Sequence, residues 1–419
     1  MRLAERLSSR GHQVHLWTNS PFVERFARPD LRLHALDTPG TYNSFLSESS
    51  LLERPSRLVE LFRKHYIPLA LNEARSMSDF VTKGKTVLVA ADAPGIAARL
   101  VAEKFRIPLV SVMTYPSHCT GRYLLERLFA TKLARDIASL RNQFGLEGGF
   151  DPSAWFGMPT RYVGLWPAWF GIRVPTTARL SQIGFLYYDP DPQIPVNTQR
   201  FIEHNRTIVL VSGGSANFGN ANVHTLAYES AKRLRLSVIA LRPSSTAPSS
   251  DSIHVISDAP SVMALMRKCA AVVHHGGMGT IGQAIGAGIP QLAIADGGDR
   301  PENGSILSQL ELGSCLTKSQ QSVREATSAM AQVMEDASMR AACDRARRSI
   351  DEEATLSTFV TDIERIADRA TIADSCVFAN QYRGVGTAPK LAESVSSEIS
   401  KLSPERRYLL ARAISARKV

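Results

Sequence analysis

The sequence predicts an α/β protein with two doubly wound, parallel-sheet domains, and three observations lead to this prediction. The chain has 419 residues, which is more than one compact core accommodates, because cores stop growing beyond about 250–300 residues. Its content of 44% hydrophobic and 21% charged residues is ordinary for a globular protein. Short apolar runs alternate with segments of helical spacing, which is typical of parallel strands joined by crossover helices.

The N-terminal half begins with a helix and a strand. Leu3 and Leu7 recur at helical spacing, Gly11 ends the helix, and the apolar run 14–18 predicts a strand. A second unit then follows, with a strand at 86–91, an Ala-rich helix at 96–105 and a strand at 108–113. This order indicates a parallel sheet with crossover helices.

The C-terminal half repeats the same alternation after a break. Residues 155–195 are rich in Pro, Gly and aromatic residues without a helical period, and Asp-Pro-Asp-Pro at 189–192 indicates a linker. Apolar runs then predict strands at 207–212, 236–241, 271–274 and 291–295, followed by helices over 323–370.

These elements suggest four segments. We expect a first domain at 1–190, a linker at 191–205, a second domain at 206–370 and a tail at 371–419. Ser403 is a good N-cap and Pro404 suits a first helical position, so the tail is expected to contain a helix.

Composition argues against several classes of protein. No apolar stretch approaches the roughly 20 residues of a membrane-spanning helix, and the N-terminus lacks the apolar core of a signal peptide, so we expect a cytoplasmic protein without stable membrane insertion. The five cysteines are scattered without a CxxC pair, which argues against a disulfide framework or a zinc site. The net charge of +10 is spread along the chain, so no nucleic-acid partner is expected.

The most informative segment is the glycine-rich run that follows the strand at 271–274. His275 comes first, three glycines lie within the next four positions, and Thr280 is expected to open a helix. Such a turn directs unpaired amide groups and the positive end of a helix dipole at one point, which suits a phosphate. The alternative is a turn that only joins strand to helix. Consecutive strand residues face opposite ways, so His274 is expected in the core and a metal shared by the two histidines is not expected.

At these residues the chain resembles the UDP-glycosyltransferase superfamily, and in particular its bacterial and fungal branch that acts on macrolides, sterols and other lipophilic natural products. Residues 275–280 read HGGMGT and match the family's HGGxGT segment. The other matching segments are AGIP at 287–290, Asp299 with Pro301 and Asn303, VSGGS at 211–215, RGHQV at 10–14 and VAAD at 89–92.

The resemblance implies a GT-B fold, in which two Rossmann-like domains face a cleft. The first domain would hold a small lipophilic acceptor, and the second would hold a UDP- or dTDP-sugar as co-substrate, with no other cofactor. Transfer to an acceptor hydroxyl would be metal-independent and would invert the anomeric carbon. Implied donor-binding residues are Gly214, Ser215, His275, Gly276, Gly277, Met278, Gly279, Thr280, Asp299 and Arg300.

The N-terminal half departs from the family's pattern. The family begins with a strand and a loop carrying its catalytic base, ahead of the helix that here occupies residues 2–10, so we expect an N-terminally incomplete chain and a parallel core broken at that strand. Asp92 matches the carboxylate that orients the family's catalytic histidine. Alternatives are that Asp92 caps the helix starting near Pro94, and that the protein is an inactive nucleotide-sugar-binding homologue.

Three further features bear on specificity. Arg300 replaces the family's usual Gln, and its fixed charge suggests an anionic donor sugar or, alternatively, a side chain turned to solvent. The segment 258–260 lacks the aromatic residue that would stack on the base of the nucleotide. The sequence therefore does not distinguish uracil from thymine as that base. The aromatic residues at 155–170 are expected in the core more than in an acceptor pocket.

Overall fold

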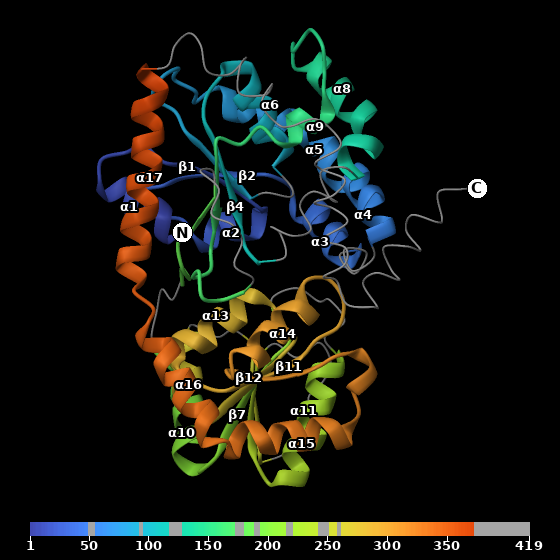
Figure 1. Cartoon of the computed structure of the whole chain (residues 1–419), viewed down its shortest axis with the longest axis vertical. Helices are drawn as coiled ribbons and strands as arrows, with labels where there is room; N and C mark the ends of the chain where they lie inside the picture. Colours follow the sequence, from blue (N-terminus) through green and yellow to red (C-terminus); the bar gives the residue numbers. More distant parts are fainter. Residues whose placement is uncertain are drawn as a thin grey trace, which may run out of the picture. The chain divides into compact units, whose positions relative to one another are not determined.

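The computed structural model describes residues 1–48, 55–91, 95–116, 128–171, 180–187, 193–214, 221–241, 251–257 and 261–372 (Figure 1). The helix expected in the tail lies outside these residues, as do Asp92, Ser215 and the segment 258–260. Within the described ranges, no helix has the length and apolar character needed to cross a membrane.

The described strands of the N-terminal half form two separate parallel sheets. One sheet pairs β1 with β2, and the other has the order β3-β4-β5-β6. The strands are β1 His15–Thr18, β2 Arg32–Ala35, β3 Leu88–Ala91, β4 Leu109–Met113, β5 Arg161–Gly164 and β6 Leu180–Gln182. β1 and β3 are each paired on one side only among the described strands. The expected break in the parallel core is therefore confirmed.

Helices supply most of the core of this half. They are α1 Arg2–Ser9, α2 Ser20–Arg25, α3 Pro39–Glu48, α4 Pro55–Leu61, the π-helical turn η2 Phe62–Tyr66, α5 Ile67–Ser78, α6 Ile96–Phe105, α8 Ala134–Gln143 and α9 Pro152–Phe156. Ala74 of α5 packs with Leu100 of α6 and Ile137 of α8 in one buried cluster. Small Ala side chains let α5 and α6 approach closely, and α6 packs against β3 and β4.

The C-terminal half holds one six-stranded parallel sheet with the order β12-β11-β10-β7-β8-β9. Its strands are β7 Ile208–Ser212, β8 Ser237–Leu241, β9 Ile253–Ile256, β10 Ala271–His274, β11 Gln291–Ile294 and β12 Gly313–Leu316. Its helices are α10 Val196–His204, α11 Ala221–Leu234, α12 Val262–Met266, α13 Met278–Ala287, α14 Arg300–Gln309, the 3-10 turn η3 Lys318–Gln320, α15 Val323–Glu335 and α16 Ala337–Arg348. Every strand predicted in either half is present, starting within two residues of its predicted start.

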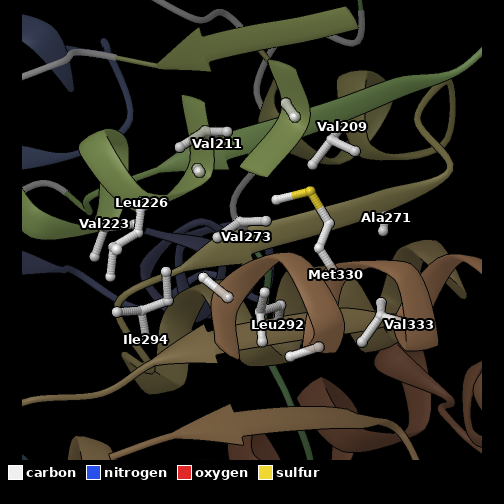
Figure 2. Close-up of a cluster of buried hydrophobic side chains, with 14 of the residues drawn as sticks. Val209, Val211, Val223, Leu226, Ala271, Val273, Leu292, Ile294, Met330 and Val333 are labelled. Carbon is white, nitrogen blue, oxygen red and sulfur yellow. The ribbon is translucent and has the colours of Figure 1, made fainter. Parts of the chain in front are cut away.

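The core of the C-terminal half lies between its sheet and the helices α11 and α15. Figure 2 shows Val211 of β7 and Val273 of β10 facing Met330 of α15, with Leu226 of α11 beside them. All four side chains are at most 4% exposed. Because the strands are covered on both faces, their apolar runs are continuous rather than alternating.

The last described helix, α17 Glu352–Ile372, packs against the N-terminal sheet. Phe359 and Ile363 of α17 share a buried cluster with Val110 of β4 and Val163 of β5. Glu364 adds an ion pair with Arg10 at 3.0 Å. This helix was assigned by sequence to the second domain, and the domain boundaries remain predictions.

Candidate functional site

The candidate site lies where the strand order of the C-terminal sheet reverses. β7 and β10 are neighbours in the sheet, with Ser212 opposite His274, although β8 and β9 lie between them in sequence. The helix α11 that follows β7 packs in one buried cluster, and the helix α13 that follows β10 packs in two others. Doubly wound sheets bind ligands beyond the carboxyl ends of the strands at such a switch point.

The turn after β10 exposes a set of backbone amides. Gly276 has φ +87°, which favours glycine, and a Cβ there would lie 3.1 Å from the Arg300 carbonyl oxygen. Gly277 is the N-cap of α13, so the helix begins at Met278, two residues before the predicted Thr280. No hydrogen bond joins the N–H groups of residues 277–280 to other described residues. The first turn of α13 can therefore donate to an anion.

His274 supports this turn from the core. It is fully buried, as predicted, and its Nδ1 accepts a hydrogen bond of 3.0 Å from Gly276 N–H. Its Nε2 therefore carries the proton and donates to Oε1 of Gln291 at 3.1 Å. Burial lowers the pKa of His274 to about 3, so the ring is neutral. Gly276 thus contributes its backbone conformation to the turn, while its own N–H is hydrogen-bonded to His274 and does not face the anion site.

His275 lies between two glycines. A Cβ on Gly214 or on Gly277 would clash with the imidazole. The ring hydrogen-bonds to the Ser212 backbone, while its buried Nδ1 has no partner among the described residues. Burial, followed by the charge of Arg300, lowers the pKa of His275 to about 4. A neutral ring is therefore held beside the turn, with Nε2 donating to the Ser212 backbone and Nδ1 left as an acceptor.

Three residues of α14 complete the site. Asp299 is the N-cap, and burial raises the pKa of its carboxyl group against the opposing effect of a hydrogen bond from Asn303. Arg300 is 8% exposed, contrary to the solvent-facing alternative, and its Nε donates to the Gly297 carbonyl at 3.2 Å. Fully buried Asn303 donates through Nδ2 to Asp299 Oδ2 at 2.6 Å and to the Gly276 carbonyl at 3.2 Å. The structure thus brings 299–303 against the turn.

Sequence reasoning missed Gln291 as part of the site. A glutamine at the start of an otherwise apolar strand was a signal, because a fully buried amide needs hydrogen-bond partners. Gln291 supplies one for His274 and donates toward the Ile281 carbonyl of α13.

The aromatic segment of the N-terminal half belongs to the core, as expected. Trp155 and Phe156 are buried in the cluster around α6 and α8, while Trp166 and Phe170 are fully buried in a second cluster. Trp155 Nε1 donates to Glu103 at 2.9 Å, which satisfies its one polar atom. These four side chains are not available to line a pocket.

Comparison with known proteins identifies relatives of the C-terminal half. Residues 240–365 match the family described as erythromycin biosynthesis protein CIII-like, C-terminal domain. The chain is 28% identical over 104 residues to 10-deoxymethynolide desosaminyltransferase of Streptomyces venezuelae, which is 25% of this chain and 24% of the relative. It is 35% identical over 86 residues to erythronolide mycarosyltransferase of Saccharopolyspora erythraea, 20% of each chain. The matched segments thus span about a quarter or less of these relatives.

Solved structures extend the similarity to the fold of almost the whole chain. The calicheamicin glycosyltransferase CalG4 has a TM-score of 0.65 at 15% identity, covering 89% of this chain and 94% of that one. The glycosyltransferase VinC, solved in complex with dTDP, has a TM-score of 0.63 at 18% identity, covering 88% and 95%. The predicted GT-B fold and the resemblance to the UDP-glycosyltransferase superfamily are confirmed.

Proposed function

We propose that this chain, with its erythromycin CIII-like C-terminal segment and GT-B fold, moves a sugar from a UDP- or dTDP-sugar to a hydroxyl of a small lipophilic acceptor, with inversion and without a metal. One observation carries the proposal. The amides of residues 277–280, the N-terminus of α13 and the imidazole of His275 converge at the switch point of the sheet. This is a site for the diphosphate of a nucleotide-sugar.

The chemistry requires two tasks of the protein. The departing nucleoside diphosphate gains negative charge as the bond to the anomeric carbon breaks, and fixed amide donors stabilise that charge without reorganising. The backbone amides of residues 277–280 suit this task, and the His275 ring packs against their turn. A base must also take the proton of the acceptor hydroxyl as it attacks from the opposite face. In the family that the chain resembles, the carboxylate matched by Asp92 orients that base, and we propose this role for Asp92 here.

The donor sugar is assigned to Asp299, whose carboxylate can accept hydrogen bonds from sugar hydroxyls. Gly214 and Ser215, after β7, are proposed to contact the donor from the other side of the switch point. Arg300 adds a permanent charge beside the turn, where it acts on His275. That position favours contact with the diphosphate over contact with an anionic sugar. In Arg300→Gln, weaker binding of the plain nucleoside diphosphate supports the diphosphate role, whereas an altered preference between glucose and glucuronate donors alone supports the sugar role.

The relatives support the lipophilic acceptor and the dTDP alternative for the donor. Two are named for transferring desosamine or mycarose to 10-deoxymethynolide or erythronolide, and VinC was solved with dTDP. The rival proposal is a nucleotide-sugar-binding protein without transferase activity.

Calorimetric titration with UDP and dTDP tests the donor site. We expect one nucleotide to bind, and His275→Ala to weaken it about tenfold, a loss of roughly 1.4 kcal/mol. His204→Ala on the exposed face of α10 is the matched control and should leave the affinity unchanged. Folded protein that binds neither nucleotide would overturn the proposal.

Transfer itself needs a separate assay. Release of nucleoside diphosphate from a bound donor, in the presence of a hydrophobic alcohol, supports the transferase. Binding with no release across a panel of acceptors supports the rival binding protein.

A further inference from the structure

Asn303 joins two parts of the site that lie far apart in sequence. It sits in the first turn of α14 and is fully buried. One side-chain nitrogen, Nδ2, donates to Oδ2 of Asp299 at 2.6 Å and to the backbone carbonyl of Gly276 at 3.2 Å. A single amide group therefore connects the N-cap of α14 with the turn that precedes α13.

A buried side-chain amide at position 303 destabilises the fold unless its polar atoms form hydrogen bonds. Asparagine is a poor helix former, and a buried polar group without a partner destabilises the folded state. The Oδ1 atom of Asn303 is buried and accepts no hydrogen bond from the described residues. An apolar residue of similar size would avoid this loss, so the two bonds made by Nδ2 call for a functional explanation.

The bond to Gly276 fixes the direction of the next amide. In a trans peptide the carbonyl and the following N–H point in opposite directions. Holding the Gly276 carbonyl toward Asn303 therefore turns the N–H of Gly277 away from it. Gly277 N–H is one of the amides without a partner among the described residues. Asn303 thus sets the orientation of a donor in the proposed diphosphate site.

The bond to Asp299 fixes a buried carboxylate. Burial raises the pKa of Asp299, and the hydrogen bond from Asn303 opposes that rise. A bond of 2.6 Å from one nitrogen also restricts rotation of the carboxylate. The same amide group that orients the turn therefore favours the ionised form of the Asp299 carboxylate and holds it in one orientation.

We infer that Asn303 is a positioning residue that couples the diphosphate-binding turn to Asp299, so that the diphosphate and the sugar of a donor are bound at a fixed separation. This inference rests on the proposed function. It assigns to Asn303 a role in discriminating the intact nucleotide-sugar from the free nucleoside diphosphate, rather than in binding either part directly.

A double-mutant cycle tests the coupling. The affinities for the free nucleoside diphosphate and for its glucose conjugate are measured by calorimetry in the wild type, Asn303→Ala, Asp299→Ala and the double variant. We expect the ratio of the two affinities to change about tenfold in each single variant and no further in the double variant, because Asn303 affects the sugar-dependent part of the affinity through the Asp299 carboxylate. Ser305→Ala, at an exposed position of α14, is the matched control and should leave the ratio unchanged.

Asn303→Asp keeps the side-chain shape and guards against a variant that fails to fold. It places a second carboxyl group beside Asp299, so discrimination should be lost at pH 8 and should recover as the pH falls and one proton is shared by the pair. A purely structural role would give no such pH dependence. Losses that are equal for both ligands, or that add in the double variant, would overturn the inference. Wild-type protein that binds no nucleotide would instead overturn the proposed function itself.

Discussion

The two halves of the chain are built from the same strand-and-helix alternation, yet the pair β7 and β10 and the pair β1 and β3 are buried to very different degrees. In the C-terminal half β7 lies between β8 and β10, and every residue of β7 and β10 is buried. In the N-terminal half no residue of β1 or β3 is fully buried, and Val89 of β3 is 37% exposed. Strands become fully buried when they have neighbours on both edges and helices on both faces. An apolar run alone does not bury a strand.

The same difference affects the functional residues. Two adjacent strands bring residues 212–214 and 274–280 together in the C-terminal half. In the N-terminal half, Asp92 follows β3, which has a described partner only on the side of β4. The half with the continuous sheet therefore holds the better defined site.

The largest expected effect comes from truncating a matched pair of leucines. Leu292 of β11 is fully buried, whereas Leu16 of β1 is only half-buried. We expect Leu292→Ala to lower the free energy of unfolding by about 2–5 kcal/mol, because it leaves a cavity, and Leu16→Ala to lower it by about 1 kcal/mol. Urea denaturation followed by circular dichroism measures both. Equal losses would show that β1 is as well packed as β11.

A pair of glycines sharpens the comparison at the site. An alanine at position 276 would have to adopt φ +87° with its Cβ against the Arg300 carbonyl, whereas a Cβ on Gly279 would meet no atom within 4 Å. We expect Gly276→Ala to weaken nucleotide binding at least about tenfold, since strain of 1–3 kcal/mol distorts the turn. Gly279→Ala, which requires no positive φ, should weaken binding less. Calorimetry distinguishes them, and similar affinities would contradict the proposed geometry.

The smallest expected effect is the pH dependence of stability that Glu73 gives to the N-terminal half. Burial, and then the charge of Asp37, raise the pKa of Glu73 in α5 to about 7. Between its unfolded pKa of about 4.5 and this value, the folded state holds the proton more tightly, so stability falls as pH rises. We expect Glu73→Gln to remove this slope and to raise the melting temperature at pH 8 by a few degrees, as about 1 kcal/mol would. At pH 4 the variant and the wild type should melt together.

Asp336 in the C-terminal half supplies a control of opposite sign. Its pKa is lowered by hydrogen bonds from the Ser338 side chain and from the backbone of Met339 and Ser338 at the start of α16. Asp336→Ala should therefore destabilise the protein at neutral pH, and the difference should vanish as the pH falls below the pKa of that carboxyl. A rise of stability in Asp336→Ala at neutral pH would contradict the capping role.

Features of the site that depend on local sequence were predicted, and features that depend on distant partners were not. The glycine-rich turn, the burial of His274 and the match of Asp299 were predictable, because each depends on local spacing or on a contiguous motif. The strands β5 and β6 were missed within the segment 155–195, because runs of three or four residues give too little periodicity. The bonds made by Gln291 and Asn303 were not predictable, since their partners are distant in sequence.

The sequence by itself determined the positions of the predicted strands and the glycine-rich turn at 276–279, because strand propensity, helical spacing and the freedom of glycine are local properties of the chain. Only the tertiary structure decided that β7 lies beside β10, that His274 bonds to Gln291, and that Asn303 links Gly276 to Asp299. The physical reason is that strand order and burial are collective. Parallel pairing and the removal of water choose among many arrangements of the same local elements, and the site exists only in the arrangement that results.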